Sequence, residues 1–235
     1  MDYFDKAETW DRATLETVQL ARLKTTIQQA SRAPFYAKRL AEAGVSADNL
    51  RSLEDIRRIP FTSKDDLRSQ YPYGLATVPH SEFVRMHCSS GTTGTPVAVC
   101  YTQPDINSWA DLMARCLYMA GVRKDDVFQN MSGYGLFTGG LGIHFGAERL
   151  GCMTIPAGAG NSKRQLKLVK DFGTTVAHIL PSYALHLGTT LIEEGEDPKA
   201  LSLRIACVGA EPYTEETRRR IEALFDMKVY NSYGL

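Results

Sequence analysis

A regular alternation of helix and strand patterns, beginning at about residue 104, constrains the fold of this sequence more than any other feature. Apolar residues at helical spacing alternate with short apolar runs bounded by turn residues, which are typical of buried strands. The predicted helices cover residues 104–120, 141–150, 182–194 and 214–225, with a further helix opened by Ser162 and Gln165, and the predicted strands cover 127–131, 153–155, 176–180, 204–208 and 228–230. Repeated βα units imply right-handed crossovers and a mostly parallel sheet with helices on both faces. We therefore predict an α/β fold.

The first 80 residues have a different pattern and are predicted to be helical. Apolar residues fall near helical spacing over residues 15–30, and a second short helix is expected from Phe35 to Gly44. Two capping boxes, Ser52–Asp55 and Thr62–Asp65, predict two more helix starts. We expect a helical N-terminal segment of residues 1–80, packed on a main α/β domain of residues 81–235.

The charge balance excludes some partners. The 235 residues contain 27 Lys and Arg against 27 Asp and Glu, so no net field attracts nucleic acid or an anionic membrane. The N-terminus lacks the basic start and apolar centre of a signal peptide, and no apolar run approaches the ~20 residues that span a membrane. We expect a cytoplasmic protein that binds neither nucleic acid nor membrane.

The cysteines and histidines do not have the spacing of a metal site. The five cysteines, at positions 88, 100, 116, 152 and 207, are odd in number and form no C-x-x-C pair, which argues against a disulfide framework and a zinc site. We predict that they are buried thiols. His178, inside the apolar run VAHIL, is predicted to be a hydrogen-bonded core residue.

The segment HCSSGTTGTPVAV, residues 87–99, joins two alternating patterns that both predict strands. A Walker-type phosphate loop is disfavoured, because no lysine follows Gly94 and Pro96 stands where its helix would begin. Two interpretations remain: a solvated hairpin loop, which composition alone favours, or a cradle for an anion. In the cradle, Gly91 and Gly94 would take positive φ, and converging N–H groups and hydroxyls would surround phosphate oxygens.

Three further glycine-containing segments follow predicted strands: SGYGLFTGG after Met131, GAEPYTEE after Val208 and NSYGL after Tyr230. In an open α/β sheet, ligands bind beyond the carboxyl ends of the strands. Each segment alone is better explained as a tight turn with a packing aromatic residue. Together they offer polar donors, flat apolar walls and closely approachable backbone, which is the composition of a nucleotide pocket with an adjoining small-molecule slot.

The segment SSGTTGTPV, residues 89–97, resembles the phosphate-binding signature of the adenylate-forming superfamily of acyl-CoA synthetases. YGLFTGG, GAEP and NSYGL are similar in content and order to the phenylacetate-CoA ligase branch of that superfamily, as are the leading segments YFDKAETWDRATLETVQLARLKTTIQQASRAPFYAKRL and LEDIRRIPFTSKDDLR. The similarity spans the whole chain. It implies the N-terminal part of the adenylate-forming fold and favours the anion cradle at residues 89–95.

The resemblance implies an AMP-forming phenylacetate-CoA ligase of phenylacetate catabolism. ATP, phenylacetate and coenzyme A would give AMP, diphosphate and phenylacetyl-CoA, with Mg2+ and fixed donors handling the polyphosphate charge. An aromatic acid fits best, because flat rings gain from contact with Tyr and Phe. We expect a homodimer whose small-molecule partners are the aromatic acid, ATP and coenzyme A.

The resemblance also implies roles for single residues. The ATP phosphates would be bound by Ser89, Ser90, Gly91, Thr92, Thr93, Gly94 and Thr95. The adenine would be flanked by Gly209, Ala210, Glu211, Pro212, Asn231, Ser232 and Tyr233, of which Tyr233 would stack on it. The acid pocket would be lined by Tyr134, Gly135, Phe137 and Gly139.

The sequence departs from the family pattern at Leu235. In the family, the YG motif continues into a threonine and a glutamate that helps to place Mg2+, followed by a ribose-binding aspartate and a small domain with the catalytic lysine. We therefore assign no catalytic residue and no metal ligand, and expect an α/β domain that is incomplete at its C-terminus and inactive alone. Two alternatives stay open: a non-catalytic nucleotide-binding module, and an adenylate-forming enzyme whose acceptor is not coenzyme A.

Overall fold

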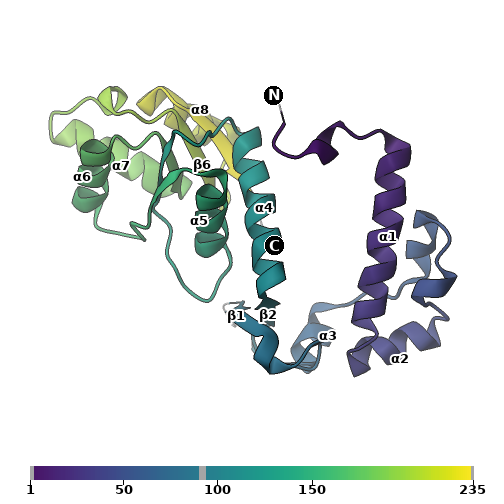
Figure 1. Cartoon of the computed structure of the whole chain (residues 1–235). Helices are drawn as coiled ribbons and strands as arrows, with labels where there is room; N and C mark the ends of the chain where they lie inside the picture. The colour runs from purple at the N-terminus through teal and green to yellow at the C-terminus, as the bar shows by residue number, and fades with distance from the viewer. Residues whose placement is uncertain (1–2, 90–93, 234–235) are drawn as a thin grey trace. The chain divides into compact units, whose positions relative to one another are not determined.

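The computed structural model describes residues 3–89 and 94–233, and its contacts divide the chain into two compact units. The first unit comprises residues 1–106 and the second comprises residues 107–235 (Figure 1). The sequence-based boundary was drawn after residue 80. The division after residue 106 assigns the predicted strand pair around residues 83–102 to the first unit.

Short helices and one hairpin form the first unit. In chain order it contains η1 (Lys6–Thr9), α1 (Arg12–Ala30), α2 (Pro34–Glu42), η2 (Ala47–Asn49), η3 (Leu53–Arg58), α3 (Lys64–Ser69), η4 (His80–Glu82), β1 (Phe83–Cys88) and β2 (Ala98–Thr102). Its helical part surrounds a small apolar core of Ile27, Leu40, Val45 and Leu50. The predicted helical lead is thereby confirmed, because apolar side chains of α1 and α2 supply half of this core.

The capping residues of the first unit were predicted only in part. Ser52 and Asp55 form the expected capping box, but the helix that they open is the 3-10 helix η3. The second box begins one residue later than predicted, because Ser63 rather than Thr62 accepts the hydrogen bond from the N–H of Asp66. Adjacent hydroxyl residues offer the same capping chemistry, so spacing alone did not separate them.

Strands β1 and β2 form the predicted antiparallel hairpin. Met86 lies opposite Cys100 and Cys88 lies opposite Ala98. Beyond the last paired residues, Ser89 donates its N–H to the carbonyl of Val97 at 3.0 Å. The ladder therefore continues to the edge of the glycine-rich loop.

The second unit is an open parallel α/β sheet, as the sequence predicted. Helix α4 (Gln103–Met119) leads into it, followed by β3 (Val127–Asn130), α5 (Gly139–Leu150), β4 (Met153–Ile155), α6 (Ser162–Phe172), β5 (Val176–Ile179), α7 (Pro181–Glu193), η5 (Pro198–Ala200), β6 (Ile205–Gly209), α8 (Glu215–Phe225) and β7 (Lys228–Ser232). The described strands of this unit pair in the order β4-β3-β5-β6-β7, and every pairing is parallel.

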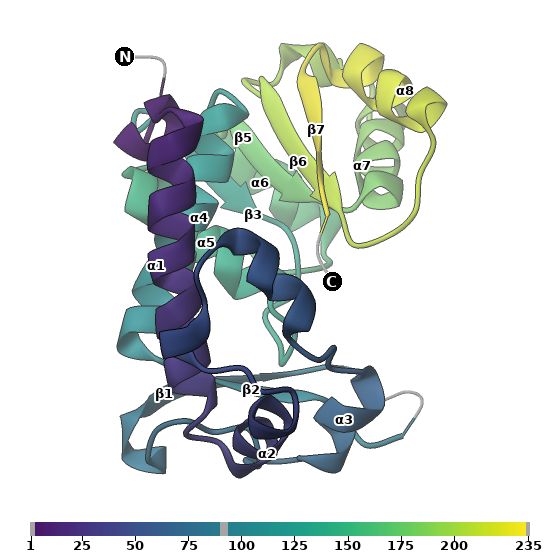
Figure 2. The ribbon, with the colours of Figure 1, turned by 90° about the vertical axis from the view of Figure 1, so that its right-hand side faces the viewer.

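Helices cover both faces of this sheet (Figure 2). On one face, α6, α7 and α8 bury Leu166, Leu187 and Ile221 against strand residues that include Val208. On the other face, α4 and α5 bury Leu117 and Ile143 against strand residues that include Phe128. This arrangement leaves the two strand ends of the sheet, rather than its faces, open to ligands.

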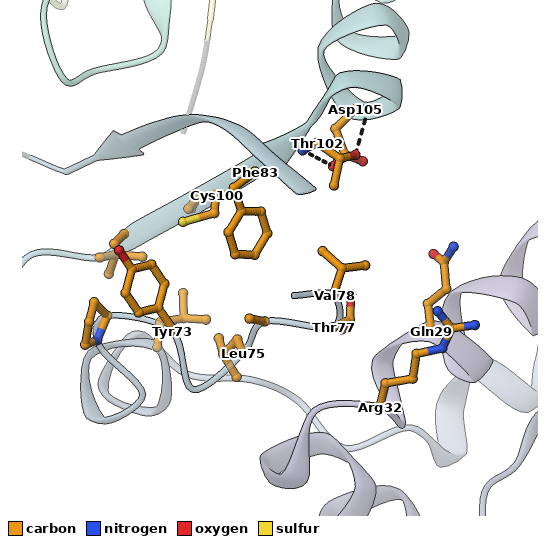
Figure 3. A pocket seen from close by; sticks show the side chains of 16 residues that line it. Gln29, Arg32, Tyr73, Leu75, Thr77, Val78, Phe83, Cys100, Thr102 and Asp105 are labelled. Carbon is orange, nitrogen blue, oxygen red and sulfur yellow. Dashed lines mark hydrogen bonds between the residues drawn. The ribbon is translucent and has the colours of Figure 1, made fainter. Parts of the chain in front are cut away.

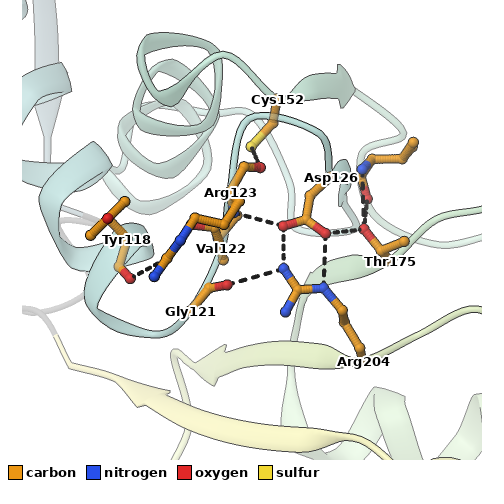
Figure 4. Close-up of polar contacts among 9 residues, drawn as sticks. Tyr118, Gly121, Val122, Arg123, Asp126, Cys152, Thr175 and Arg204 are labelled. Atoms are coloured by element: carbon orange, nitrogen blue, oxygen red, sulfur yellow. Dashed lines mark hydrogen bonds and ion pairs between the residues drawn. The ribbon is translucent and has the colours of Figure 1, made fainter. Parts of the chain in front are cut away.

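A polar cluster ties together the amino ends of β3, β5 and β6 (Figure 4). The Asp126 carboxylate accepts from Thr175 Oγ1 at 2.7 Å and from Arg204 Nε at 2.9 Å, and a second hydrogen bond comes from Arg204 Nη2. Burial alone would raise the pKa of Asp126, but the hydrogen bonds from Arg204, Thr175 and the N–H of Arg123 outweigh it and lower the pKa. The carboxylate thus stays charged and pins the starts of the three strands.

Two sequence expectations for this unit were wrong. Helix α6 is capped by Asn161, whose side chain accepts from the N–H of Arg164, and not by Ser162. The cysteines are free thiols, as predicted, but only Cys152 and Cys207 are buried, while Cys116 is exposed. An exposed cysteine on a helix was missed because the apolar stripe of α4 also includes exposed positions such as Leu112.

Within the described residues, no helix is both long and apolar enough to span a lipid bilayer.

Candidate functional site

The predicted site residues of the second unit gather at the carboxyl ends of the parallel strands. Strands β3, β5, β6 and β7 end at Asn130, Ile179, Gly209 and Ser232. Because parallel strands end at the same edge of a sheet, their following loops lie on one side of the molecule. The register confirms this, since Asn130 pairs with His178 and Gly209 pairs with Ser232.

The loop after β3 carries the predicted acid-pocket residues Tyr134, Gly135, Phe137 and Gly139. Side chains Tyr134 and Phe137 are both more than a third exposed. A Cβ atom at Gly135 or Gly139 would lie within 3.8 Å of the Phe137 ring. The ring thus lies close to the loop backbone at both glycines, at distances of ordinary van der Waals contact, and half of it is exposed.

Asn130 fixes the two ends of this loop. Its amide Nδ2 donates to the carbonyl of Gly140 at 2.7 Å. Its Oδ1 accepts from the Ser132 hydroxyl at 2.7 Å and from the Ser132 N–H at 3.2 Å. Asn130 is completely buried, and such a satisfied buried amide specifies one loop conformation.

His178, at the end of β5, joins the same amide. Its Nδ1 lies 3.0 Å from Asn130 Oδ1 and 3.1 Å from the Ser132 hydroxyl. Since Asn130 Oδ1 can only accept, His178 donates from Nδ1, and Nε2 is left as an acceptor. Burial lowers the pKa of His178 to about 4, so the ring is neutral at physiological pH. The prediction of a hydrogen-bonded histidine is confirmed. Its position at the carboxyl ends of the parallel strands, which we call the ligand edge because the candidate site lies there, was not predicted.

The loop after β6 carries Gly209, Ala210, Glu211 and Pro212, predicted to flank adenine. A Cβ atom at Gly209 would overlap the carbonyl oxygen of Ser232, so only glycine fits there. Ala210 adopts the left-handed conformation, with φ of 68°. The Glu211 carboxylate accepts from the N–H of Ser182 at 2.6 Å, in the first turn of α7. This carboxylate therefore positions the loop on a helix N-terminus, where negative charge is favoured.

The end of β7 carries the remaining predicted adenine residues. Asn231 and Ser232 are the last residues of the strand, and Tyr233 follows with 81 % of its surface exposed. The pairing of Ser232 with Gly209 brings these residues beside the loop after β6. An exposed aromatic ring beside a turn with closely approachable backbone is a suitable surface for a flat base.

The predicted phosphate loop belongs to the first unit. Ser90, Gly91, Thr92 and Thr93 lie outside the described residues. Gly94 has φ of 126°, a conformation that glycine adopts without steric cost. Ser89 Oγ accepts from the N–H of Val97 at 2.9 Å, which leaves its O–H available to donate. Ser89 and Val97 thus extend the β1–β2 hairpin by one further pair of hydrogen-bonded residues.

The first unit also has a cavity of about 360 Å³ (Figure 3). Tyr73, Leu75 and Phe83 form its apolar side, and Gln29 and Arg32 of the α1 region stand at another side. Of the described residues with predicted roles, none lines this cavity.

Comparison with known proteins identifies the family of this chain. The family model described as AMP-binding enzyme matches residues 13–235. The chain belongs to this family.

Relatives of the AMP-binding family with curated names point to one branch. The chain is 47 % identical over 232 residues to a phenylacetate-coenzyme A ligase of Pseudomonas putida, covering 98 % of the chain and 53 % of the relative. It is 45 % identical to a ligase of the same name from Thermus thermophilus, covering 100 % and 53 %. The chain therefore spans about half the length of these relatives.

A solved structure of the family has the same fold. An open conformation of 2-hydroxyisobutyryl-CoA ligase, in complex with 2-HIB-AMP and CoA, superposes with a TM-score of 0.90. The two sequences are 30 % identical, and the match covers 100 % of this chain and 53 % of the other. The expected N-terminal part of the adenylate-forming fold is confirmed.

Sequence reasoning missed the polar residues that hold the loops of the candidate site in place. Asn130, Ser132 and His144 were given no role, although each contacts a predicted loop or its anchor. Asn130 and Ser132 flank the strand end, and a polar residue interrupting an apolar strand was the available signal. His144 lies ten residues from its partner, across a loop and a helix turn, and no local pattern marks that pairing.

Proposed function

We propose that this chain supplies the acid-binding and nucleotide-binding part of an AMP-forming phenylacetate-CoA ligase. The observation that carries the proposal is the gathering of three glycine-containing loops, after β3, β6 and β7, at the carboxyl edge of one parallel sheet. The similarity to named phenylacetate-coenzyme A ligases, at 47 % and 45 % identity, selects this branch among the reactions that such an edge could serve.

The proposed reaction has two steps. A carboxylate oxygen of phenylacetate attacks the α-phosphorus of ATP, and diphosphate leaves. The thiol sulfur of coenzyme A then attacks the acyl carbon, its proton is released, and AMP leaves with the bonding electrons. Both steps require fixed donors around phosphate oxygens and a site that orients the acid, rather than a nucleophile supplied by the protein.

The loop after β3 is proposed to bind the acid. The Phe137 ring and the Tyr134 ring are accessible apolar surfaces beside glycines, and aromatic pairs in offset or edge contact stabilise each other by about 0.5–1.5 kcal/mol beyond area burial. A flat aryl acid gains more from such walls than a flexible chain does, since it loses less rotational freedom on binding.

The turn of Gly209–Pro212 and the end of β7 are proposed to bind adenine. The left-handed Ala210 exposes backbone groups of the turn, and Tyr233 offers an exposed ring. Ser89–Thr95 is proposed to bind the β and γ phosphates, which its backbone N–H groups and hydroxyls would surround. Glu211 acts here through the position of the loop, because its carboxylate is bonded to the N–H of Ser182.

Magnesium enters this proposal only as the counter-ion of ATP. The part of the chain that the structure describes contains no group of three His, Cys, Asp or Glu side chains that could hold a metal ion. Mg2+ in nucleotide sites is held mainly by substrate phosphates and water, with one or two carboxylates, so we propose that it enters with ATP and assign it no described residue. Fixed N–H and O–H donors are the part of charge neutralisation that we assign to this chain.

Calorimetric titration of the purified 235-residue chain tests the proposal. We expect AMP and a non-hydrolysable sulfamoyl analogue of phenylacetyl-adenylate to bind, the analogue more tightly because it reaches both loops. Binding of AMP with no gain from the phenylacetyl group would favour a nucleotide-binding module instead. Binding of neither ligand by a chain that melts cooperatively would contradict the proposal.

A homodimer, a cytoplasmic location and a role in phenylacetate catabolism are further proposals. The names of the relatives support phenylacetate and coenzyme A as the compounds on which the proposed catabolic role would act. Sedimentation analysis of the chain at several concentrations would test the dimer, for which a single monomeric species is the contradicting result.

A further inference from the structure

Tyr134, in the proposed acid pocket, is linked through His144 to Glu148. The Tyr134 hydroxyl lies 3.1 Å from His144 Nδ1, and the two rings meet edge to face at 5.7 Å. His144 Nε2 lies 3.1 Å from Glu148 Oε1, one turn further along α5. The His144 side chain is only 13 % exposed, and it lies between the more exposed Tyr134 and Glu148.

The chemistry of the three groups fixes the direction of these hydrogen bonds. A carboxylate only accepts, so Glu148 holds the proton of His144 on Nε2. In the neutral ring, Nδ1 is then an acceptor, and the Tyr134 hydroxyl donates to it. The single proton of this hydroxyl is thereby directed away from any ligand.

Burial raises the pKa of Tyr134, and the Glu148 charge acts in the same direction. The hydroxyl therefore keeps its proton, and its hydrogen-bond partner on helix α5 is His144 Nδ1.

We propose that His144 and Glu148 are positioning residues that anchor the Tyr134 hydroxyl inside the protein, so that Tyr134 meets the acid with its ring alone. The proposal rests on the function proposed above for the loop after β3. Its consequence is a selectivity: the wall formed by Tyr134 accepts an apolar aryl ring and offers no hydroxyl proton to a polar ring substituent. A ligand that accepted this proton would leave the internal hydrogen bond to His144 unmade.

Matched variants test the anchor. Tyr134→Phe and His144→Leu both break it, whereas His144→Gln keeps an acceptor for Tyr134 and a donor for Glu148. We expect each breaking variant to weaken binding of the sulfamoyl phenylacetyl-adenylate analogue roughly 3- to 10-fold while AMP affinity stays unchanged. Because both changes remove one interaction, the double variant should bind no more weakly than either single variant. His144→Gln should restore binding to within about 2-fold.

Two results would overturn the proposal. One is a Tyr134→Phe chain that binds the phenyl analogue as the unaltered chain does. The other is a larger loss for a 4-hydroxyphenylacetyl analogue than for the phenyl analogue, since that would mean direct contact between the hydroxyl and the ligand.

A measurement without ligand separates this proposal from the proposed function. Nitrogen NMR of the unaltered chain should report His144 with its proton on Nε2, and Tyr134→Phe should shift the Nδ1 resonance. A proton on Nδ1 would overturn the anchor even if ligands bind. An intact anchor in a chain that binds neither AMP nor the analogue would leave the hydrogen-bond assignment correct and the proposed function wrong.

Discussion

The loop after β3 and the loop after β6 leave the same edge of the sheet, but different forces hold them. Side chains hold the first: Asn130 bonds both ends, His178 bonds to Asn130, and Tyr134 bonds to His144. The second loop is fixed by its backbone conformation, because the backbone of Gly209 lies close to the carbonyl of Ser232 and Ala210 is left-handed. The first loop should therefore respond to protonation and to side-chain chemistry, and the second to changes of backbone freedom.

The largest expected effect is a pH dependence of the side-chain-held loop. The pKa of His178 is lowered from 6.5 to about 4. Between these values the unfolded chain binds more protons, so the contribution of His178 to stability is complete above 6.5 and is lost as the pH falls toward 4. The free energy of unfolding should fall by about 3 kcal/mol more than in His178→Gln across this range.

Urea titrations of both proteins near neutral pH and near the lower pKa measure this difference. Subtracting the glutamine variant removes the acid sensitivity of carboxylates such as Asp126, which both proteins share. Equal losses in the two proteins would show that His178 does not titrate with folding.

A methyl group at Gly209 should give the next largest effect. Gly209→Ala places Cβ against the Ser232 carbonyl, and backbone on both sides must move. We expect a loss of about 2–3 kcal/mol in the free energy of unfolding, as for overpacking of a tight site. Gly139→Ala is the matched control, because its Cβ would meet only the Phe137 ring at an ordinary 3.8 Å. Similar losses for both would mean that backbone closeness does not distinguish the second loop.

Removing the exposed ring of the first loop should affect the acid and not the nucleotide. Phe137→Ala should weaken binding of an arylacetyl-adenylate analogue by about 1–2 kcal/mol, through lost apolar and aromatic contact. AMP affinity and the melting temperature should stay nearly unchanged, because the ring is half exposed without ligand. Leu136→Ala, also exposed, should leave both affinities unchanged. An equal loss of AMP affinity in Phe137→Ala would indicate that the conformations of the two loops depend on each other.

The smallest expected effect is a gain of stability at Ala210. Its left-handed backbone costs an alanine about 1–2 kcal/mol, and glycine removes that cost while adding freedom to the unfolded chain. Ala210→Gly should therefore stabilise the protein by about 0.5 kcal/mol, whereas Ala223→Gly in helix α8 should destabilise it by about 1 kcal/mol. The melting temperatures of the two variants should shift in opposite directions. Shifts of the same sign would contradict the inference that the backbone of Ala210 is strained.

The βα order of the second unit was predictable because buried strands such as β6 are continuously apolar, and period and turn residues are local signals. The loops of the ligand edge were predictable for the same reason, since each follows a recognised strand. The side chains that support those loops were not predictable. Asn130 and His178 are 48 residues apart in sequence and meet only through the parallel pairing of β3 with β5. A pattern within one segment contains no information about that contact.

The predicted helix boundaries were wrong where two neighbouring residues can both act as the N-cap. Asn161 and Ser162 can both cap a helix, and the choice of Asn161 depends on its left-handed backbone, with φ of 55°. The position of Cys116 along the helical repeat likewise did not predict its exposure, because exposure depends on what packs against α4.

The pairing of Asp126 with Arg204 lies at the amino ends of the strands, opposite the ligand edge. This separation places the residues that align the strands and the loops of the candidate site at opposite ends of the sheet. Changes in the loops that we propose to bind the ligand do not touch the ion pair that aligns the strand starts, so such changes can accumulate without altering the register of the strands. Under this proposal, the acid that is bound can change in small steps, each of which still folds. Variation directed at these loops should yield more folded proteins than equal variation around Asp126.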